Sequence, residues 1–239
     1  MSAPALSQPR TRIAAFVSGG GSNMLAVHDF QQARGAQAAG EIVLVVSNRP
    51  TCAALGRATA RGLTTAVLAD PRDGAAVLAL LAAHRIEVLV LAGYLAFVPD
   101  AVTRAFRGRI VNVHPSLLPA FGGHGMYGRH VHAAVLAAGA RISGATVHFV
   151  DEIYDRGAII AQWPVPVFEE DSPESLAERV LRVEHALLPR VVELLCAESL
   201  ALDDDGTVHG VFLTGTQADV FSLQAAAPLD ADLDRALNK

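Results

Sequence analysis

The chain has 239 residues, a formal net charge of −5 at pH 7 and a hydrophobic fraction of 51%. This length and composition support one large domain with a sizeable core and argue against a disordered chain. The acidic balance, without any strongly basic stretch, argues against nucleic acid as a partner. No segment reaches the roughly 18 apolar residues that a membrane span needs, so we expect no membrane partner either.

The two cysteines, Cys52 and Cys196, are isolated and form no C-x-x-C motif. This spacing suggests neither a disulfide framework nor a zinc cluster. Because residues 1–11 contain no apolar run of signal-peptide length, we expect a cytoplasmic protein and interpret these residues as a flexible tail. We expect a single domain over residues 12–215 and a second tail over residues 216–239. Small molecules are the expected partners, and the chain is predicted to be a monomer or a homodimer.

Short apolar runs alternate with helical patterns through the first half of the chain. Near-continuous apolar runs are typical of parallel strands that are covered on both faces. The strands are predicted at 12–18, 41–47, 63–68, 87–92 and 110–114, and the helices from Met24 onward and at 52–61, 73–84 and 100–106. This alternation predicts an α/β fold with a doubly wound, mostly parallel sheet.

The second half is expected to finish the sheet differently. An acidic turn joins two further strands, which we interpret as a hairpin, so that the sheet ends antiparallel. The elements predicted here are a helix at 131–138, strands at 142–150 and 159–167, an amphipathic helix at 173–196 capped by Asp171 or Ser172, and a last strand at 208–213.

The first predicted strand leads into Gly19-Gly20-Gly21-Ser22-Asn23, and a helix follows. Glycine lets the backbone approach a ligand closely, and the free N–H groups at a helix start favour an anion. We expect Ser22 or Asn23 to be the N-cap. The pattern is not a dinucleotide fingerprint, since Met24 stands where a glycine is needed, and it has no P-loop lysine. It predicts a loop that binds phosphate or carboxylate, with a plain strand-to-helix turn as the alternative.

Asn112 and His114 stand at the end of the fifth predicted strand, which Pro115 terminates. Residues two apart in a strand project from the same face, so these side chains are expected to lie side by side. Open α/β sheets bind their ligands at this end of the strands. An amide and an imidazole aimed at one point suit a reaction that develops a negative oxygen. The alternative is a strand end with a hydrogen-bonded Asn and an ordinary His.

Two loops are expected to border this strand end. The apolar loop at 93–99 could line a pocket for a flat ring or could be a covered loop. The glycine-rich loop at 120–129 contains His124 and precedes His130 and His132, but no carboxylate or Cys accompanies them at ligand spacing. We therefore expect no metal and interpret this segment as a flexible loop over the site.

With these motifs in place, the chain resembles the folate-dependent phosphoribosylglycinamide formyltransferases. The resemblance covers roughly residues 12–196, and its motifs occur in the family's order. They are the loop 18–23, Leu91-Ala92-Gly93, Asn112-Val113-His114-Pro115-Ser116-Leu117-Leu118-Pro119, the segment 144–157 with Asp155, and Glu184-His185-Ala186. The Asn-x-His segment with a downstream Asp is typical of formyltetrahydrofolate-using transferases and hydrolases, and the Gly-Ser-Asn loop narrows the resemblance to the glycinamide enzymes.

The resemblance implies a Rossmann-like formyltransferase fold, a reaction and a set of site residues. The reaction passes the formyl group of 10-formyltetrahydrofolate, as cosubstrate, to the amine of 5-phosphoribosylglycinamide in purine biosynthesis. The catalytic trio would be Asn112, His114 and Asp155. The substrate-binding residues would be Gly21, Ser22, Asn23 and Glu184, and the folate-binding residues Arg72, Leu95, Ala96, Phe97, Val98 and Asn112.

Two features depart from the family pattern. Ala96 stands where the family often has Arg, so a side-chain contact with folate is lost while backbone contacts remain. The segment between Pro119 and Val131 is also longer than in the commonest members, and the role of its His residues is left open. We interpret His148, on a strand beside Phe149, as structural.

The expected chemistry agrees with the resemblance. Attack of an amine on a formyl carbon creates a negative oxygen, which Asn112 and a protonated His114 would stabilise. Asp155 would favour the imidazolium form and assist proton transfer. The alternatives are a turn-capping role for Asp155 and a solvated helix face or a buried ion pair for Glu184.

Three other functions stay open at this point. A 10-formyltetrahydrofolate hydrolase would use the same trio with water as the acceptor, but such enzymes usually carry an N-terminal regulatory domain. A methionyl-tRNA formyltransferase would need a basic tRNA-binding surface. A non-catalytic phosphometabolite-binding protein would bind its ligand without turnover.

Overall fold

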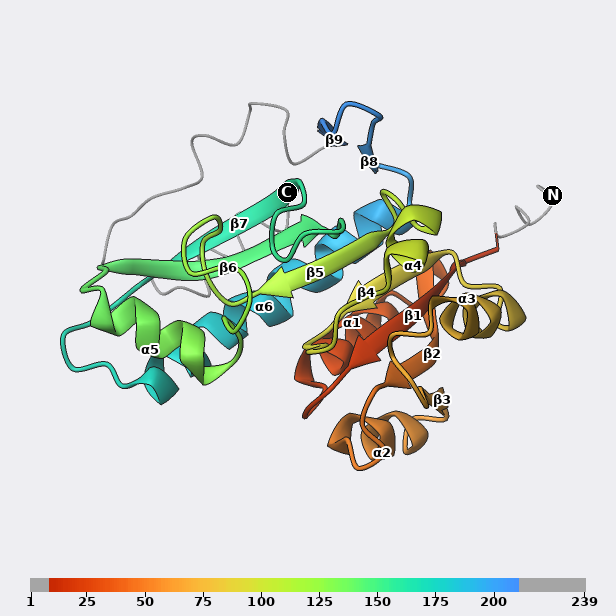
Figure 1. Cartoon of the computed structure of the whole chain (residues 1–239), viewed down its shortest axis with the longest axis horizontal. Coiled ribbons are helices and arrows are strands. Elements are labelled where there is room, and N and C mark those ends of the chain that lie inside the picture. Colours follow the sequence, from red (N-terminus) through yellow and green to blue (C-terminus); the bar gives the residue numbers. More distant parts are fainter. Residues whose placement is uncertain (1–8, 211–239) are drawn as a thin grey trace, which may run out of the picture.

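The computed structural model describes residues 9–210, which form a seven-stranded sheet with helices on both faces and a separate two-stranded sheet (Figure 1). The expected tail at residues 216–239, and most of the one at residues 1–11, lie outside the described residues. In chain order the elements are β1 (Thr11–Val17), α1 (Ser22–Arg34), η1 (Gly35–Gln37), β2 (Gly40–Ser47), α2 (Ala53–Thr59), β3 (Thr64–Val67), α3 (Gly74–Ala83), β4 (Val88–Leu91), α4 (Asp100–Ala105), β5 (Ile110–His114), α5 (Arg129–Ala137), β6 (Ile142–Phe149), β7 (Ile159–Pro166), α6 (Pro173–Cys196), β8 (Leu200–Leu202) and β9 (Val208–Gly210).

The order of strands in the main sheet is β3-β2-β1-β4-β5-β6-β7. The chain moves outward from β1 to β3 and then returns to the other side of β1 with β4. This reversal creates the switch point at which open α/β sheets bind ligands. Strands β1 to β5 are parallel, and β6 and β7 add an antiparallel edge. The predicted fold class is therefore confirmed.

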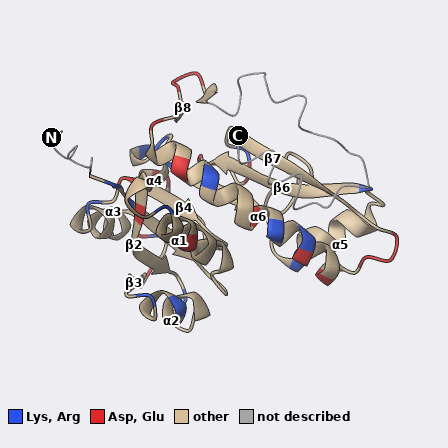
Figure 2. Ribbon diagram, turned by 180° about the vertical axis from the view of Figure 1, so that it is seen from behind, with Lys and Arg blue, Asp and Glu red and all other residues tan. Residues whose placement is uncertain are grey.

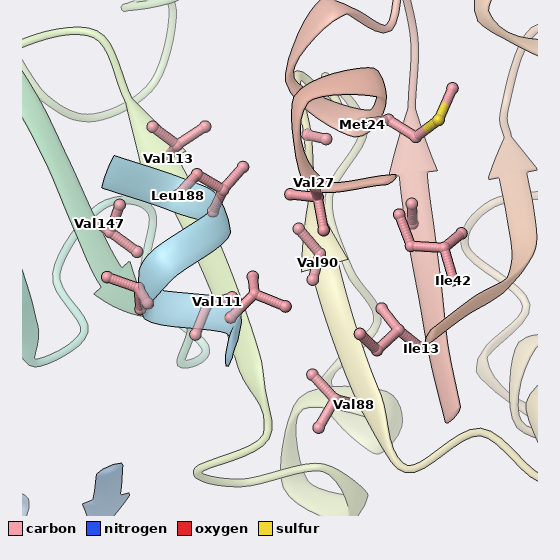
Figure 3. Packing of buried hydrophobic residues seen from close by; sticks show 14 of the residues in the cluster. Ile13, Met24, Val27, Ile42, Val88, Val90, Val111, Val113, Val147 and Leu188 are labelled. Atoms are coloured by element: carbon pink, nitrogen blue, oxygen red, sulfur yellow. The ribbon is translucent and has the colours of Figure 1, made fainter. Parts of the chain in front are cut away.

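Alternate residues of the central strands build a separate core on each face of the sheet. In β1, Ile13 and Val17 belong to the core that lies under α1 and α6 and that also contains Val27 and Leu188. Figure 3 shows Ile13, Val27 and Leu188 among the side chains of this core. Phe16 belongs to the core on the opposite face, under α3 and α4. Burying one such side chain contributes about 1.5–3 kcal/mol. Both faces need apolar residues, which explains why these strands are apolar throughout.

The long helix α6 positions one wall of the site. Its buried side packs on the sheet through Leu187, Leu188 and Val191, and its outer side carries charges of both signs (Figure 2). Its start is fixed by Ser172, whose hydroxyl accepts the N–H of Ser175 while the Ser175 hydroxyl accepts the N–H of Ser172. Ser172 was one of the two expected caps, and it is the one found.

One expectation about the elements is wrong: helix α1 begins at Ser22 with Gly21 as its N-cap, so neither Ser22 nor Asn23 caps it. The strand expected at 208–213 is present as β9 over Val208–Gly210, and residues 211–213 lie outside the described part of the chain. Strand β9 pairs with β8 in a small hairpin outside the main sheet. Strand β8 has only three residues, too few for a period-2 pattern to reveal it. Among residues 9–210, no helix is long and apolar enough to cross a membrane.

Candidate active site

A cavity of about 700 Å³ lies among the start of α1, the ends of β4 and β5 and the middle of α6. A second cavity of about 50 Å³ shares four of its wall residues: Tyr94, Asn112, Tyr154 and Asp155. The two spaces therefore meet at the end of β5. Such an arrangement suits two reactants that enter from different sides and react where the cavities join.

The turn between β1 and α1 requires glycine at its last position. Gly21 has a φ of 76°, and a Cβ at this residue would lie 2.5 Å from the Cβ of Ala54. An L side chain would therefore meet both backbone strain and a clash. The first N–H groups of α1 have no acceptor within the helix, and they make its start a favourable place for an anion. Gly21 and Ser22 form this start, and Asn23 lines the larger cavity.

Asn23 and Glu184 are joined across the wall of the larger cavity. Asn23 Nδ2 donates to Glu184 Oε2 at 2.6 Å, and the two residues are 8% and 6% exposed. Burial raises the pKa of Glu184 to about 7, and the bond from Asn23 opposes this shift. Asn23 Oδ1 has no partner among the described residues although it is buried. A buried acceptor beside a carboxylate is suited to ligand hydroxyl groups, which can donate to both.

The loop after β4 is tied to the glycine turn. Ser18 donates its N–H to the Gly93 carbonyl at 3.0 Å, and its hydroxyl accepts the N–H of Leu95 at 2.9 Å. Leu95 consequently lines the larger cavity. The smaller cavity is lined from the same loop by Ala96, Phe97 and Val98. The structure therefore brings all four loop residues of the predicted folate set to the site.

The predicted trio meets at the end of β5. Asn112 and His114 project from this strand, and the turn after β6 brings Asp155 to them. Asp155 Oδ2 lies 3.4 Å from His114 Nδ1 and accepts the N–H of Gly123 at 2.8 Å. The side chains of His114 and Asp155 are only 4% and 8% exposed. Water therefore screens little of the electrostatic interaction between the imidazole and the carboxylate.

His114 is held between two oxygen atoms. Its Nε2 lies 2.9 Å from the Phe121 carbonyl, which can only accept, so this nitrogen carries a proton. Its Nδ1 faces Asp155. Burial lowers the pKa of His114, while the Asp155 carboxylate and the Phe121 carbonyl oppose that shift. Asp155 thus favours the imidazolium form, as expected, while burial of the ring opposes it.

The glycine-rich loop covers the larger cavity, as expected for a loop over the site. Residues 123–129 all line it, and Phe121 contributes the carbonyl that holds His114. The histidines of this segment diverge: His132 is buried and lines the cavity, whereas His130 is exposed. Within residues 9–210, no group of three or more His, Cys, Asp or Glu side chains could hold a metal.

Arg72 is the one predicted site residue that lies away from the other predicted site residues. It lies on the loop between β3 and α3, its side chain is 86% exposed, and it pairs with Asp70 at 3.2 Å. It does not line either of the two cavities. Its assignment to folate stays a prediction.

Other cavity residues were missed from the sequence. Arg49, on the turn after β2, lines the larger cavity, and its guanidinium makes no hydrogen bond or ion pair with residues 9–210. Arg49 could have been predicted from the sequence, because it follows the carboxyl end of a predicted parallel strand, where ligands bind. His148, interpreted as structural, lies against Asn112 with 3.0 Å between its Nε2 and Asn112 Nδ2. This contact depends on the register of β5 and β6, which the sequence does not determine.

The fold and site define an α/β enzyme that brings two reactants together at the carboxyl end of a parallel sheet. Residues 11–192 match the family described as formyl transferase, and the chain belongs to this family. The expectation of a folate-dependent formyltransferase is thereby confirmed.

The relatives make this class more specific. The chain is 43% identical over 204 residues to the chloroplastic phosphoribosylglycinamide formyltransferase of Arabidopsis thaliana, covering 82% of this chain and 69% of the relative. It is also 43% identical to the enzyme of that name from Vigna unguiculata, of which it covers 64%. The crystal structure of glycinamide ribonucleotide transformylase 1 from Symbiobacterium toebii is 34% identical, with a TM-score of 0.76, and the match covers 84% of this chain and 93% of that one.

Proposed function

We propose that the chain transfers the formyl group of 10-formyltetrahydrofolate to the amine of 5-phosphoribosylglycinamide in purine biosynthesis. The observation that carries this proposal is the position of Asn112, His114 and Asp155 at the wall of the larger cavity, with Asn112 and Asp155 also lining the smaller one. The names of the relatives support it. We expect the protein to act in the cytoplasm, as a monomer or a homodimer, on small molecules and without a metal.

The larger cavity fits the phosphoribosyl substrate. The N–H groups at the start of α1, over Gly21 to Asn23, would bind its phosphate, and Arg49 would supply the positive charge. Glu184 and the free Oδ1 of Asn23 would accept hydrogen bonds from the ribose hydroxyls. The net charge of −5 gives no general attraction for an anion, so these local donors must provide it.

The smaller cavity and the loop beside it would supply the contacts for the pterin ring of the folate cosubstrate. The side chains of Leu91, Tyr94 and Val98 make much of its wall apolar, which suits the faces of a flat ring. The carbonyl groups and the remaining N–H groups of residues 95–98 would pair with the polar edge of the ring, and Ala96 adds no charge of its own. Arg72 would contact the more distant part of the folate.

The trio would act on the formyl carbon. The amine nitrogen forms a bond to this carbon, whose oxygen becomes negative and would accept a hydrogen bond from Asn112. His114 would add a second hydrogen bond when its Nε2–H turns from the Phe121 carbonyl to this oxygen. The carbon–nitrogen bond to the folate then breaks, and a proton passes from the amine to the departing nitrogen. Asp155 and His114 lie 3.4 Å apart and can carry that proton between them. Burial keeps water out, which favours the amine over water as the acceptor.

The test is an absorbance assay of tetrahydrofolate release from 10-formyltetrahydrofolate, with and without phosphoribosylglycinamide. Release that depends on the amine is expected. Equal release without the amine would identify a hydrolase and contradict the proposal. No release from folded protein, with saturable ligand binding, would favour the non-catalytic alternative.

A further inference from the structure

His148 lies directly opposite Asn112 in the sheet. The two residues are paired across the antiparallel strands β5 and β6, and His148 is 2% exposed. Its ring makes one contact at each nitrogen. Nδ1 lies 2.7 Å from the carbonyl oxygen of Phe149, and Nε2 lies 3.0 Å from Nδ2 of Asn112. A buried imidazole with both nitrogens engaged has a fixed orientation.

The contact with Phe149 determines where the proton of the ring lies. A carbonyl oxygen can only accept a hydrogen bond, so Nδ1 of His148 must be the protonated nitrogen. Burial lowers the pKa of His148, which favours the neutral ring. A neutral ring with its proton on Nδ1 has a bare lone pair on Nε2, and this lone pair points at Asn112.

This lone pair selects one orientation of the Asn112 amide. With Nδ2 towards His148, the contact is a hydrogen bond that Asn112 donates. With the amide turned over, Oδ1 would face the lone pair at the same distance and repel it. Asn112 therefore keeps its nitrogen on the side of β6, and the second N–H of that nitrogen remains for a substrate oxygen.

We propose that His148 is a positioning residue for catalysis, which fixes the orientation of the Asn112 amide through its Nε2 acceptor. Asp155 Oδ1 lies 3.7 Å from the same Nε2, which is too far for a hydrogen bond. The Nε2 lone pair is therefore left for Asn112. His148 thus orients Asn112 without pairing with the carboxylate that serves His114. The inference rests on the proposed function, because it assumes that Asn112 donates to the developing oxyanion.

Two substitutions of His148 distinguish the effect of its hydrogen-bond acceptor from the effect of its side-chain volume. His148→Met fills similar space without an acceptor, so we expect kcat to fall roughly tenfold to a hundredfold while KM for both substrates stays within about twofold. His148→Gln can present an oxygen near the position of Nε2 and should recover much of the lost kcat. Equal kcat losses in both variants would show that shape alone matters and would overturn the proposal, and so would near-normal kcat in H148M.

A double-mutant cycle tests whether His148 acts through Asn112. In a chain that already carries Asn112→Ala, H148M should lower kcat no further, whereas a merely structural role would lower it again. The matched control is Val147→Ala, a buried neighbour on the other face of β6, which should lower Tm and leave kcat unchanged.

Nitrogen NMR of the whole protein gives a readout that needs no turnover. It should show His148 neutral with its proton on Nδ1 at neutral pH, and a proton on Nε2 instead would overturn the proposal. If the wild-type chain does not use phosphoribosylglycinamide at all, the proposed function fails. The NMR result then still decides whether His148 orients Asn112.

Discussion

At the scale of single residues, His114 shows why burial and contact must be considered together. Its ring is nearly enclosed, which disfavours a positive charge, yet an oxygen atom faces each of its nitrogens. Burial prevails and lowers the pKa. A ring that is neutral but close to a carboxylate can take up a proton and return it, which is the behaviour required of an acid–base group.

Replacing His114 with Ala should lower kcat by roughly a hundredfold to ten-thousandfold, because it removes both the donor and the proton carrier. The measurement is amine-dependent tetrahydrofolate release, with circular dichroism to show that the fold is intact. His209→Ala removes an exposed histidine paired with Asp203 and is the control. Near-normal turnover in H114A would contradict the role assigned to the trio.

Arg49 gives a prediction about binding alone. Arg49→Ala should raise KM for phosphoribosylglycinamide roughly tenfold and leave kcat nearly unchanged, because the phosphate is remote from the bond being made. Arg104→Ala is the control, since Arg104 lies on α4 and pairs with Asp100. A loss confined to kcat would mean that Arg49 does not hold the phosphate.

Glu184 lines the site and also makes the free energy of unfolding depend on pH. Its pKa is 4.5 in an open chain and about 7 in the fold, so the folded state binds the proton more tightly. The contribution of this proton to the free energy of unfolding is fully present below pH 4.5 and is lost as the pH rises through about 7. At alkaline pH, a buried carboxylate remains that destabilises the fold.

Glu184→Gln should therefore raise Tm at alkaline pH by a few degrees and change it little at acid pH, since the charge removed is present only when the pH is high. The same change should raise KM for phosphoribosylglycinamide, because an amide is a weaker acceptor for ribose hydroxyls. Thermal denaturation against pH measures the first effect, with the exposed Glu41→Gln as a control. A Tm difference that is the same at every pH would exclude this linkage.

At the scale of elements, α6 presents Glu184 to the cavity from its buried side. Its start is held by Asp171, which accepts two hydrogen bonds from Arg179 at 2.7 and 2.8 Å. The Asp171 side chain is 3% exposed, and the bonds from Arg179 hold the pKa of this carboxyl well below its usual 3.8. The stability from this contact is present above 3.8 and is lost as the pH falls below it.

Asp171→Asn should lower the free energy of unfolding by on the order of 2 kcal/mol at neutral pH, because one charge of a bidentate pair is removed. The difference from wild type should shrink once the pH is well below 3.8. Urea denaturation at both pH values gives the comparison. Glu174→Gln, which breaks an exposed ion pair with Arg129, should change little.

At the scale of the whole molecule, the site is built from segments that are far apart in the sequence. The glycine turn follows β1, the proposed trio comes from β5 and the turn after β6, and Glu184 comes from α6. A ligand held by all of them links segments that lie far apart in the sequence, from the glycine turn to Glu184. Its binding should therefore stabilise the fold as a unit.

Phosphoribosylglycinamide at about one hundred times its Kd should stabilise the protein by about 2.7 kcal/mol, seen as a rise in Tm. Ribose 5-phosphate should give a smaller rise at the same concentration, since it lacks the glycinamide group. Asn23→Ala should remove most of the shift because it breaks the link to Glu184. An unchanged shift in that variant would count against the sugar site.

The sequence predicted the main sheet because its signals are local. Apolar runs such as β2 and β4 reflect strands covered on both faces, and glycines and prolines separate them from the helices. Asn112 and His114 could be placed together because alternation along one strand is also local. The hairpin of β6 and β7 followed from the turn between them.

Contacts across the sheet could not be predicted in the same way. The pairing of Asn112 with His148 depends on strand register, and the approach of Asn23 to Glu184 depends on how α6 crosses α1. The lowered pKa of His114 depends on burial, which is a property of the packed molecule and could not be predicted from the sequence. Arg72 was placed by resemblance, and the geometry around it gives that assignment no support.

The hydrogen bond between Asn23 and Glu184 joins residues 161 positions apart. A ribosome makes the glycine turn before α6, so the two walls of the sugar site cannot meet until α6 has left the exit tunnel. Until then, the apolar face that α6 covers stays exposed, and the growing chain has β5 but no complete place for the ribose. Ligand binding can thus begin only after α6 has been made, when the same helix both closes the core and finishes the site.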